Sequence, residues 1–172
     1  MNHRLDHTFF DRDALEIAPE ILGKTLVRIM PEGTRICLPV TEVEVYRGME
    51  DLACHASKGM TERNRVMFSR GGIIYMYLVY GVHWMFNIVT GQAGHPEALL
   101  IRGVGDIIGP SRVTKQLEMG RDFYGEDMVL SDRIWLADRP LIKNYCTGPR
   151  VGIKYAGEPW VSIPWRYRIE PV

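Results

Sequence analysis

The sequence predicts an α+β fold: a single domain with a curved, mostly antiparallel sheet, a protruding β-hairpin and peripheral helices. Three apolar extended runs follow one another closely, at residues 73–79, 83–90 and 97–103, which is typical of hairpins and not of regular β-α-β units. Helical signals are few and short. A chain of 172 residues is long enough to bury one core, so residues 1–172 are expected to form one domain.

The helices are predicted from capping residues and prolines. Asp13 can cap a short helix that ends before Pro19, and Pro19 suits the first turn of a second helix that ends at Gly23. Ser111 can cap a third helix that continues to Met119. The free amide groups at such a helix start are a natural contact for phosphate.

Turn residues and apolar runs define the remaining elements. Further strands are expected at Lys24–Ile29, Arg35–Tyr46, Arg133–Leu136 and Tyr167–Ile169. The second of these should break near Pro39, because proline cannot donate to a strand ladder. Residues 47–72 and 122–132 are expected to be loops, the first with a helical turn after Thr61.

Composition argues against several classes of protein. Lys plus Arg and Asp plus Glu both number 21, and this net charge of zero argues against a general nucleic-acid coat. No apolar run approaches about 20 residues, so no membrane association is expected. Three widely separated cysteines favour a reducing compartment, here the cytoplasm. The five histidines lack metal-ligand spacing, so no metal is expected.

Basic residues gather locally even though the total charge is balanced. Arg63 and Arg65 lie close together in one loop, and Arg112 follows Ser111 at the predicted helix start. We expect these four residues to contact a phosphate backbone, because phosphate binding depends on the local field. An ordinary solvated charge run is the alternative.

The segment 75–81, Tyr-Met-Tyr-Leu-Val-Tyr-Gly, is the most informative part of the chain. Tyr75 and Tyr77 share one face of a predicted strand, whereas Tyr80 precedes Gly81 where the chain turns into the next strand. A ring at a hairpin tip is normally exposed and available for contacts. The alternative is a tyrosine-rich sheet with one stray surface ring.

Glu42, Glu44 and Tyr46 share one face of another predicted strand. A carboxylate beside a ring could hold a planar substrate and take a proton from an attacking water, a role typically worth about 10²–10⁴ in rate. The alternative is the solvated face of an edge strand.

Three further polar residues could belong to a site. His55 lies among small residues in a loop, although a lone histidine is often a structural hydrogen-bonding residue. Arg102 ends an apolar strand and could orient Glu44, meet a phosphate or simply face solvent. Asn87 interrupts an apolar strand, so it is either a structural pin or a contact at the floor of a pocket.

Taken in order, these segments resemble the alkyladenine, or 3-methyladenine, DNA glycosylase family. The resemblance covers the chain from Phe9 to Ile169. It is carried by LGKTLVR at 22–28, TEVEVY at 41–46, His55-Ala56-Ser57, Arg63-Asn64-Arg65, YMYLVYG at 75–81, Asn87-Ile88, LLIR at 99–102, Gly109-Pro110-Ser111, RVGI at 150–153 and Ala156-Gly157-Glu158.

The resemblance implies an enzyme that flips an alkylated or deaminated purine out of double-stranded DNA and hydrolyses its N-glycosidic bond. Glu44 then resembles the base that activates water, Arg102 its companion, and Tyr80 the wedge that fills the vacated stack. The implied walls and floor of the pocket are Tyr46, His55, Tyr77 and Asn87. No cofactor is implied. No lyase activity is implied either, because the matched motifs contain no active-site lysine.

The resemblance further implies a bacterial-type, nucleoid-associated protein that acts as a monomer on damaged DNA. Val82, His83 and Cys54 depart from the pattern of the vertebrate members, which leaves the preferred lesion open.

Two other functions fit parts of the pattern. A non-catalytic lesion sensor would use the same pocket, with Glu44 buried as a structural partner of Arg102. A nucleoside or sugar hydrolase would use Glu42 and Glu44 as paired carboxylates, but it leaves Tyr80 unexplained.

Overall fold

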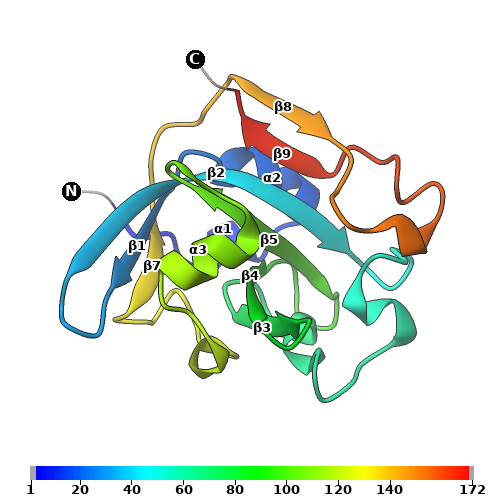
Figure 1. The fold of residues 1–172 in the computed structure, drawn as a ribbon, viewed down its shortest axis with the longest axis horizontal. Coiled ribbons are helices and arrows are strands. Elements are labelled where there is room, and N and C mark those ends of the chain that lie inside the picture. The colour runs from blue at the N-terminus through cyan, green and yellow to red at the C-terminus, as the bar shows by residue number, and fades with distance from the viewer. Residues whose placement is uncertain (1–2, 171–172) are drawn as a thin grey trace.

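The strands pair into a sheet in which all neighbours run antiparallel (Figure 1). In the computed structural model, which describes residues 3–170, they are β1 Thr25–Ile29, β2 Arg35–Arg47, β3 Ile74–Val79, β4 His83–Val89, β5 Glu97–Val104, β6 Ile107–Ile108, β7 Ile134–Ala137, β8 Tyr145–Gly148 and β9 Arg166–Ile169. The main strand order is β3-β4-β5-β2-β1-β7; β6 pairs with β5, and β9 pairs with both β2 and β8. The predicted α+β fold is confirmed, although β6 and β8 were not foreseen.

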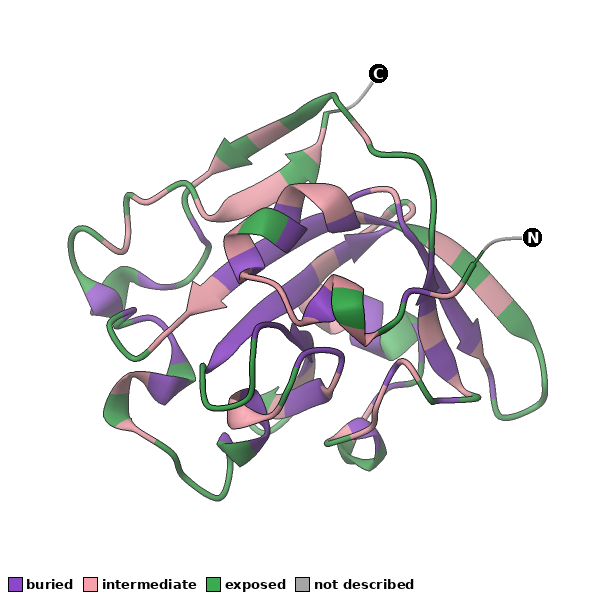
Figure 2. Cartoon of the chain, turned by 180° about the vertical axis from the view of Figure 1, so that it is seen from behind, coloured by how far each residue is buried: buried purple, intermediate pink, exposed green. Residues whose placement is uncertain are grey.

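Short helices surround this sheet. They are α1 His7–Phe10, α2 Ala14–Ile21 and α3 Pro110–Gln116, with 3-10 turns η1 His55–Lys58, η2 Arg65–Phe68, η3 Arg121–Phe123 and η4 Lys154–Ala156. The two opposite views place α2 and α3 on different sides of the sheet (Figures 1 and 2). Within residues 3–170, none of the helices has the length and apolar character needed to cross a bilayer.

The N-terminal helices differ from the prediction. Asp13 is the N-cap, as expected, and its side chain accepts a hydrogen bond from the Leu15 amide at 2.9 Å. The helix then runs through Pro19 as one element, so the predicted second helix is wrong. The reason is a continuous buried face made by Ala14, Ile17, Ala18 and Ile21. Burial of this face outweighs the one backbone hydrogen bond that proline removes.

The predicted cap of α3 is also wrong. Gly109 is the N-cap and the helix begins at Pro110, so Ser111 lies inside the first turn. Pro110 has no N–H group, and the amides of Arg112 and Val113 donate to the Gly109 carbonyl oxygen at 3.0 Å. The start of this helix therefore offers fewer free donors for phosphate than the sequence indicated.

The long strand β2 changes partner along its length. Residues 35–39 pair with β1 and residues 40–47 with β5, so the predicted break at Pro39 is a change of partner within a continuous strand. A bulge follows, where Glu42 pairs with Gly103 out of step with its neighbours. A Cβ atom on Gly103 would lie 2.7 Å from the Thr41 hydroxyl oxygen, so the close approach requires glycine. The bulge fixes which face of the strand carries the carboxylates.

The main core lies between the helices and the sheet. Its largest buried side chains include Phe10, Phe86 and Phe123. A second, smaller cluster around Met67 and Tyr75 packs beneath the loops that follow β2. Figure 2 shows buried residues concentrated in the central strands and exposed residues in the surrounding loops.

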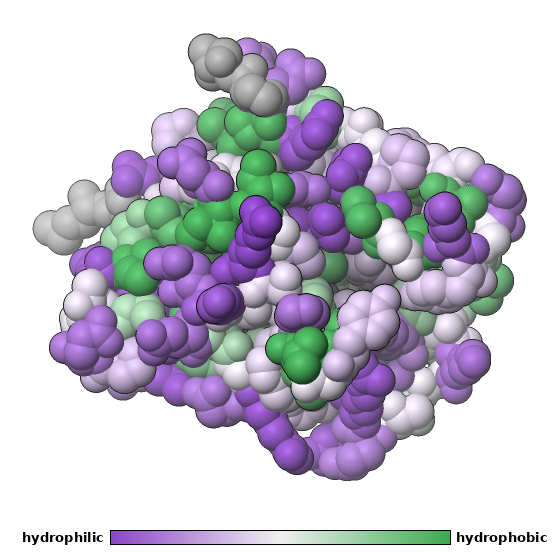
Figure 3. Space-filling view, in the orientation of Figure 1, coloured by the Kyte–Doolittle hydropathy of each residue, from purple (hydrophilic) through white to green (hydrophobic). Residues whose placement is uncertain are grey.

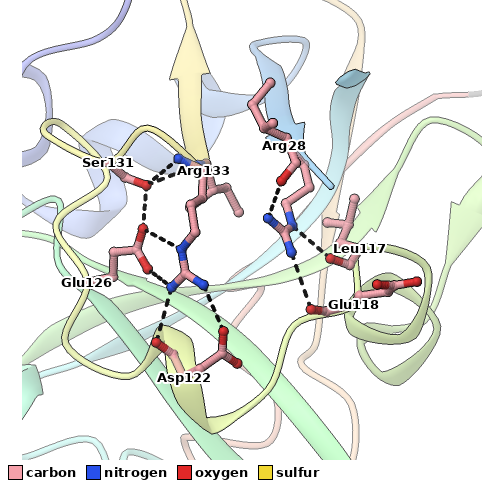
Figure 4. Close-up of polar contacts among 9 residues, drawn as sticks. Arg28, Leu117, Glu118, Asp122, Glu126, Ser131 and Arg133 are labelled. Carbon is pink, nitrogen blue, oxygen red and sulfur yellow. Dashed lines mark hydrogen bonds and ion pairs between the residues drawn. The ribbon is translucent and has the colours of Figure 1, made fainter. Parts of the chain in front are cut away.

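Two arginines hold the segment between α3 and β7. Arg28 on β1 donates to a backbone carbonyl oxygen of this segment at 2.9 Å, and Arg133 pairs with Asp122 and Glu126 (Figure 4). Their guanidinium carbons lie 4.7 and 4.1 Å from the centre of the Phe123 ring. Side-chain contacts thus order much of the stretch that the sequence predicted to be a loop.

Candidate functional site

A cavity of about 610 Å³ opens beside the β3–β4 hairpin. Its walls come from β2, β3, β4 and β5 and from the loops around residues 53–67 and 151–155. Most of the predicted site residues line it: Tyr46, His55, Arg63, Tyr77, Tyr80, Asn87 and Arg102. Residues spread over some sixty positions of the sequence therefore meet at one opening.

The other predicted residues lie outside this lining. Glu44 is behind the wall, and Arg65 on η2 is exposed and pairs with Glu62 at 3.5 Å. Ser111 and Arg112 line a second hollow of about 420 Å³, which they share with residues 82–84 of the hairpin. Of the expected phosphate contacts, Arg63 therefore lines the cavity, whereas Ser111 and Arg112 line a different hollow.

Glu44 is fully buried. Its Oε1 accepts a hydrogen bond from the Val151 amide at 2.7 Å and lies 3.4 Å from Arg102 Nε, and its Oε2 accepts one from the Tyr46 hydroxyl at 3.0 Å. All three partners line the cavity. The carboxylate thus lies directly behind the cavity wall, covered by the groups that bind it. The solvated edge strand that the sequence left open as an alternative is excluded for Glu44, because β2 pairs here with β5 on one side and β9 on the other.

Burial and nearby charge shift the pKa of Glu44 in opposite directions. Burial raises the pKa of Glu44, while the positive charge of Arg102 and the hydrogen bonds from Val151 and Tyr46 counteract part of that rise. Arg102 Nε also donates to Glu42 at 3.1 Å. One arginine is thus shared between the two carboxylates that the strand places on the same face.

His55 and two tyrosines form an aromatic wall. The ring centroids of His55 and Tyr77 are 4.5 Å apart, and those of Tyr75 and Tyr77 are 5.4 Å apart. His55 Nδ1 shares a hydrogen bond with the Tyr75 hydroxyl at 2.9 Å. Burial, assisted by the charge of Arg63, lowers the pKa of His55 to about 4. The imidazole is therefore neutral at pH 7, with one donor and one acceptor nitrogen.

Asn87 is a structural pin that also lies at the cavity surface. Its Nδ2 donates to the backbone carbonyl oxygens of Tyr75 at 3.1 Å and Met85 at 3.3 Å, which is the behaviour of a structural pin. The residue is 3% exposed and also lines the cavity. Its amide is therefore held in a fixed orientation at the cavity surface.

Tyr80 occupies the tip of the hairpin and is 90% exposed. Its φ is 52° and that of Gly81 is 70°, and the Val82 amide donates to the Val79 carbonyl oxygen at 3.2 Å. This is the pattern of a type I′ turn, whose usual central pair is Asn-Gly. A left-handed tyrosine costs about 1–2 kcal/mol. The ring is thus held in solvent at the cavity rim against its local preference, a common mark of a functional residue.

Comparison with known proteins decides the family. The model of the methylpurine-DNA glycosylase family matches residues 8–108 and 106–171. The chain belongs to this family.

Relatives in the methylpurine-DNA glycosylase family align over almost the whole chain. A protein of Methanocella arvoryzae, named as a candidate 3-methyladenine DNA glycosylase, is 40% identical over 95% of this chain and 90% of its own. A protein of the same name from Anaeromyxobacter dehalogenans is 36% identical over 96% and 83%. Another, from the Wolbachia of Brugia malayi, is 35% identical over 98% of both chains.

The sequence did not predict that residues 150–155 of this methylpurine-DNA glycosylase family member would contribute to the site. Val151 supplies the amide that binds Glu44, and Tyr155 lines the cavity. Arg150 anchors the segment by contacting both carboxylate oxygens of Asp51, at 2.6 and 2.9 Å, with both side chains fully buried. The Arg-Val-Gly-Ile motif was visible in the sequence, but a backbone donor leaves no side-chain signal.

Exposed apolar side chains border the cavity among polar ones. Besides Tyr80, Val151 is 48% exposed and Tyr155 is 71% exposed. In the space-filling view, hydrophobic side chains on this face form separate groups within a largely hydrophilic surface (Figure 3). In the described part of the chain, no group of three or more His, Cys, Asp or Glu residues is placed to hold a metal ion.

Proposed function

We propose that this protein is a monofunctional DNA glycosylase of base excision repair, which flips a damaged purine out of duplex DNA and hydrolyses the bond between base and sugar. One observation carries the proposal. An aromatic-walled cavity has the exposed Tyr80 at its rim and the buried Glu44 carboxylate behind its wall. Extrusion, base binding and hydrolysis each need one of these three features.

The aromatic residues supply the energy for extrusion. Flipping a base costs a few kcal/mol, and stacking on an aromatic side chain contributes about 1–3 kcal/mol per base. Tyr80 would fill the vacated stack, while His55 and Tyr77 hold the base. Purines methylated at N3 or N7 carry a positive charge, which electron-rich rings favour. A neutral His55 adds no repulsion against them.

Glu44 is proposed as the base that activates the attacking water. A carboxylate whose pKa is raised by burial accepts a proton more readily than an exposed one. Water cannot reach it while Val151, Arg102 and Tyr46 cover both oxygens. The mechanism therefore requires that nucleotide binding opens one of these contacts. Val151 is the best placed to move, since its side chain is half exposed.

Water, and not an amine of the protein, is the proposed nucleophile. Among the described residues that line the cavity there is no lysine, which leaves no side chain to form a Schiff base with the sugar. We further propose that the single domain acts as a monomer on double-stranded DNA in the cytoplasm, near the nucleoid. Its phosphate contacts would come from Arg63, Arg65, Ser111 and Arg112.

A lesion sensor without catalysis is the second candidate, and one observation favours it. Glu44 has no exposed surface and is paired with Arg102, as a purely structural carboxylate would be. Such a sensor would bind flipped bases in the same cavity but release none.

Base release decides between the candidates. Duplexes that contain one hypoxanthine or one 3-methyladenine are incubated with excess protein, and the free base is quantified. Release above background from damaged duplex supports the hydrolase. Damage-specific binding without release would establish the sensor, and equal cleavage of free nucleosides would indicate a nucleoside hydrolase instead.

A further inference from the structure

Tyr155 combines an exposed ring with a fixed hydroxyl group. The residue lies on η4 and is 71% exposed, yet its hydroxyl donates to the Ala53 carbonyl oxygen at 3.1 Å. The backbone on both sides is anchored as well, because Ile153 and Ala156 are buried and pack with Ala53 in a small cluster. The ring is therefore held in one place, although most of it faces solvent.

This ring also lines the cavity. Tyr155 and Tyr77 both line the cavity, and after burial the largest influence that raises the pKa of Tyr77 is Tyr155. Tyr80 lines the same cavity from the hairpin, whereas Tyr155 comes from a segment much later in the chain, drawn in orange in Figure 1. Two exposed aromatic rings, carried by two different segments, thus border one opening.

An exposed and immobilised ring contributes little to the stability of the fold. It loses rotamer freedom and leaves apolar area in water. Lys154, its neighbour on the same turn, is also exposed. Aromatic rings beside cationic side chains are typical of surfaces that bind single-stranded nucleotides, because the base stacks on the ring while the cation meets the phosphate. A nucleotide swung out of a duplex is locally single-stranded.

We propose that Tyr155 is a second stacking residue, whose ring packs against the extruded nucleotide and retains it at the mouth of the cavity. This inference rests on the proposed base-flipping function and adds a residue to it. Tyr80 contacts the duplex that the nucleotide has left, and Tyr155 contacts the nucleotide itself.

Substitution of Tyr155 separates its ring from its hydroxyl. The probe is a duplex with a non-cleavable 2′-fluoro analogue of deoxyinosine, and the dissociation constant is measured by fluorescence anisotropy. Tyr155→Ala should weaken binding about 5- to 150-fold, the usual effect of losing one stacked base. Tyr155→Phe should stay within about threefold of the native protein. Tyr145→Ala is the matched control, since Tyr145 is 37% exposed on β8 and does not line the cavity; it should change nothing.

Two results would overturn the inference. Equal weakening by Tyr155→Phe and Tyr155→Ala would mean that the hydroxyl contact with Ala53 matters and the ring does not. Unchanged binding by Tyr155→Ala would exclude any contact with the nucleotide. If Tyr155→Ala does not fold, Tyr155→Leu decides in the same way, because it keeps the apolar bulk without an aromatic face. Failure of the native protein to prefer damaged over intact duplex would instead overturn the proposed function.

Discussion

The change Asp51→Asn tests how the segment that covers Glu44 is held in place. Arg150 contacts both oxygens of the Asp51 carboxylate, and neither side chain is exposed. Asparagine keeps the size of the side chain but removes its charge, so the guanidinium would remain buried without a counter-ion. Breaking a buried pair in this way costs about 3–5 kcal/mol, a large part of the total stability of about 5–15 kcal/mol that is typical of a domain.

The contacts that Arg150 keeps set the expected size of this effect. It also donates to the Val45 carbonyl oxygen at 2.9 Å, and its guanidinium carbon lies 4.9 Å from the centre of the Tyr46 ring and 5.1 Å from that of Trp165. These contacts survive in the variant and partly compensate the charge. We therefore expect a loss near the lower end of the range, about 3 kcal/mol.

Urea unfolding followed by tryptophan fluorescence measures the loss of stability in Asp51→Asn. Glu62→Gln is the control, because it breaks an exposed pair with Arg65 and should have no measurable effect. Base release by Asp51→Asn should also slow while the variant is still folded, because residues 151–155 would lose the anchor that holds them at the cavity wall. A stability loss below about 1 kcal/mol would refute the reasoning from a buried, uncompensated charge.

Three further changes test individual residues. The Gln side chain of Glu44→Gln cannot accept a proton, so single-turnover base release should fall at least about 10²-fold. Affinity for damaged duplex should stay within about tenfold. A parallel loss of release and affinity would contradict separate roles for chemistry and flipping. Tyr80→Asn suits the φ of 52°, so the free energy of unfolding should rise by about 1 kcal/mol while damaged duplex binds more weakly; stronger or unchanged binding would remove the wedge role. The pKa of His55 is lowered from 6.5 to about 4, so the unfolded chain binds this proton more readily and native stability should rise with pH between about 4 and 6.5. In urea unfolding at a series of pH values, His55→Gln should flatten that rise, and equal slopes would argue against a buried neutral imidazole.

Local patterns in the sequence were sufficient to predict much of the fold. Closely spaced apolar runs predicted the hairpins, and Gly81 predicted a turn that exposes Tyr80. The errors arose where tertiary contacts outweigh local preference. Burial of one helical face carries α2 through Pro19, and Gly109 takes the capping position expected of Ser111.

The parts of the site that depend on side chains could be predicted from the sequence. The parts that depend on backbone groups could not. Strand alternation placed Glu44 beside Tyr46, and their hydrogen bond is present in the structure. The burial of Glu44 could not be inferred, because its cover includes the amide of Val151, 107 residues away in the sequence. Nor could the exposed position of Tyr155 be inferred, since its turn is held by contacts of Ile153 and Ala156 with the distant Ala53.

The irregular pairing of β2 has a consequence for how this family member can vary in length. An extra residue in the turn at 31–34 would only enlarge an exposed connection, since β1 and the rest of β2 can keep their pairing. An extra residue between the bulge and Glu44 would turn every later side chain to the opposite side of the strand. Glu44 would then point where Val45 now fills the core. Insertions should therefore be tolerated at the outer end of β2, whereas an insertion within a few residues of Glu44 should abolish its placement at the cavity.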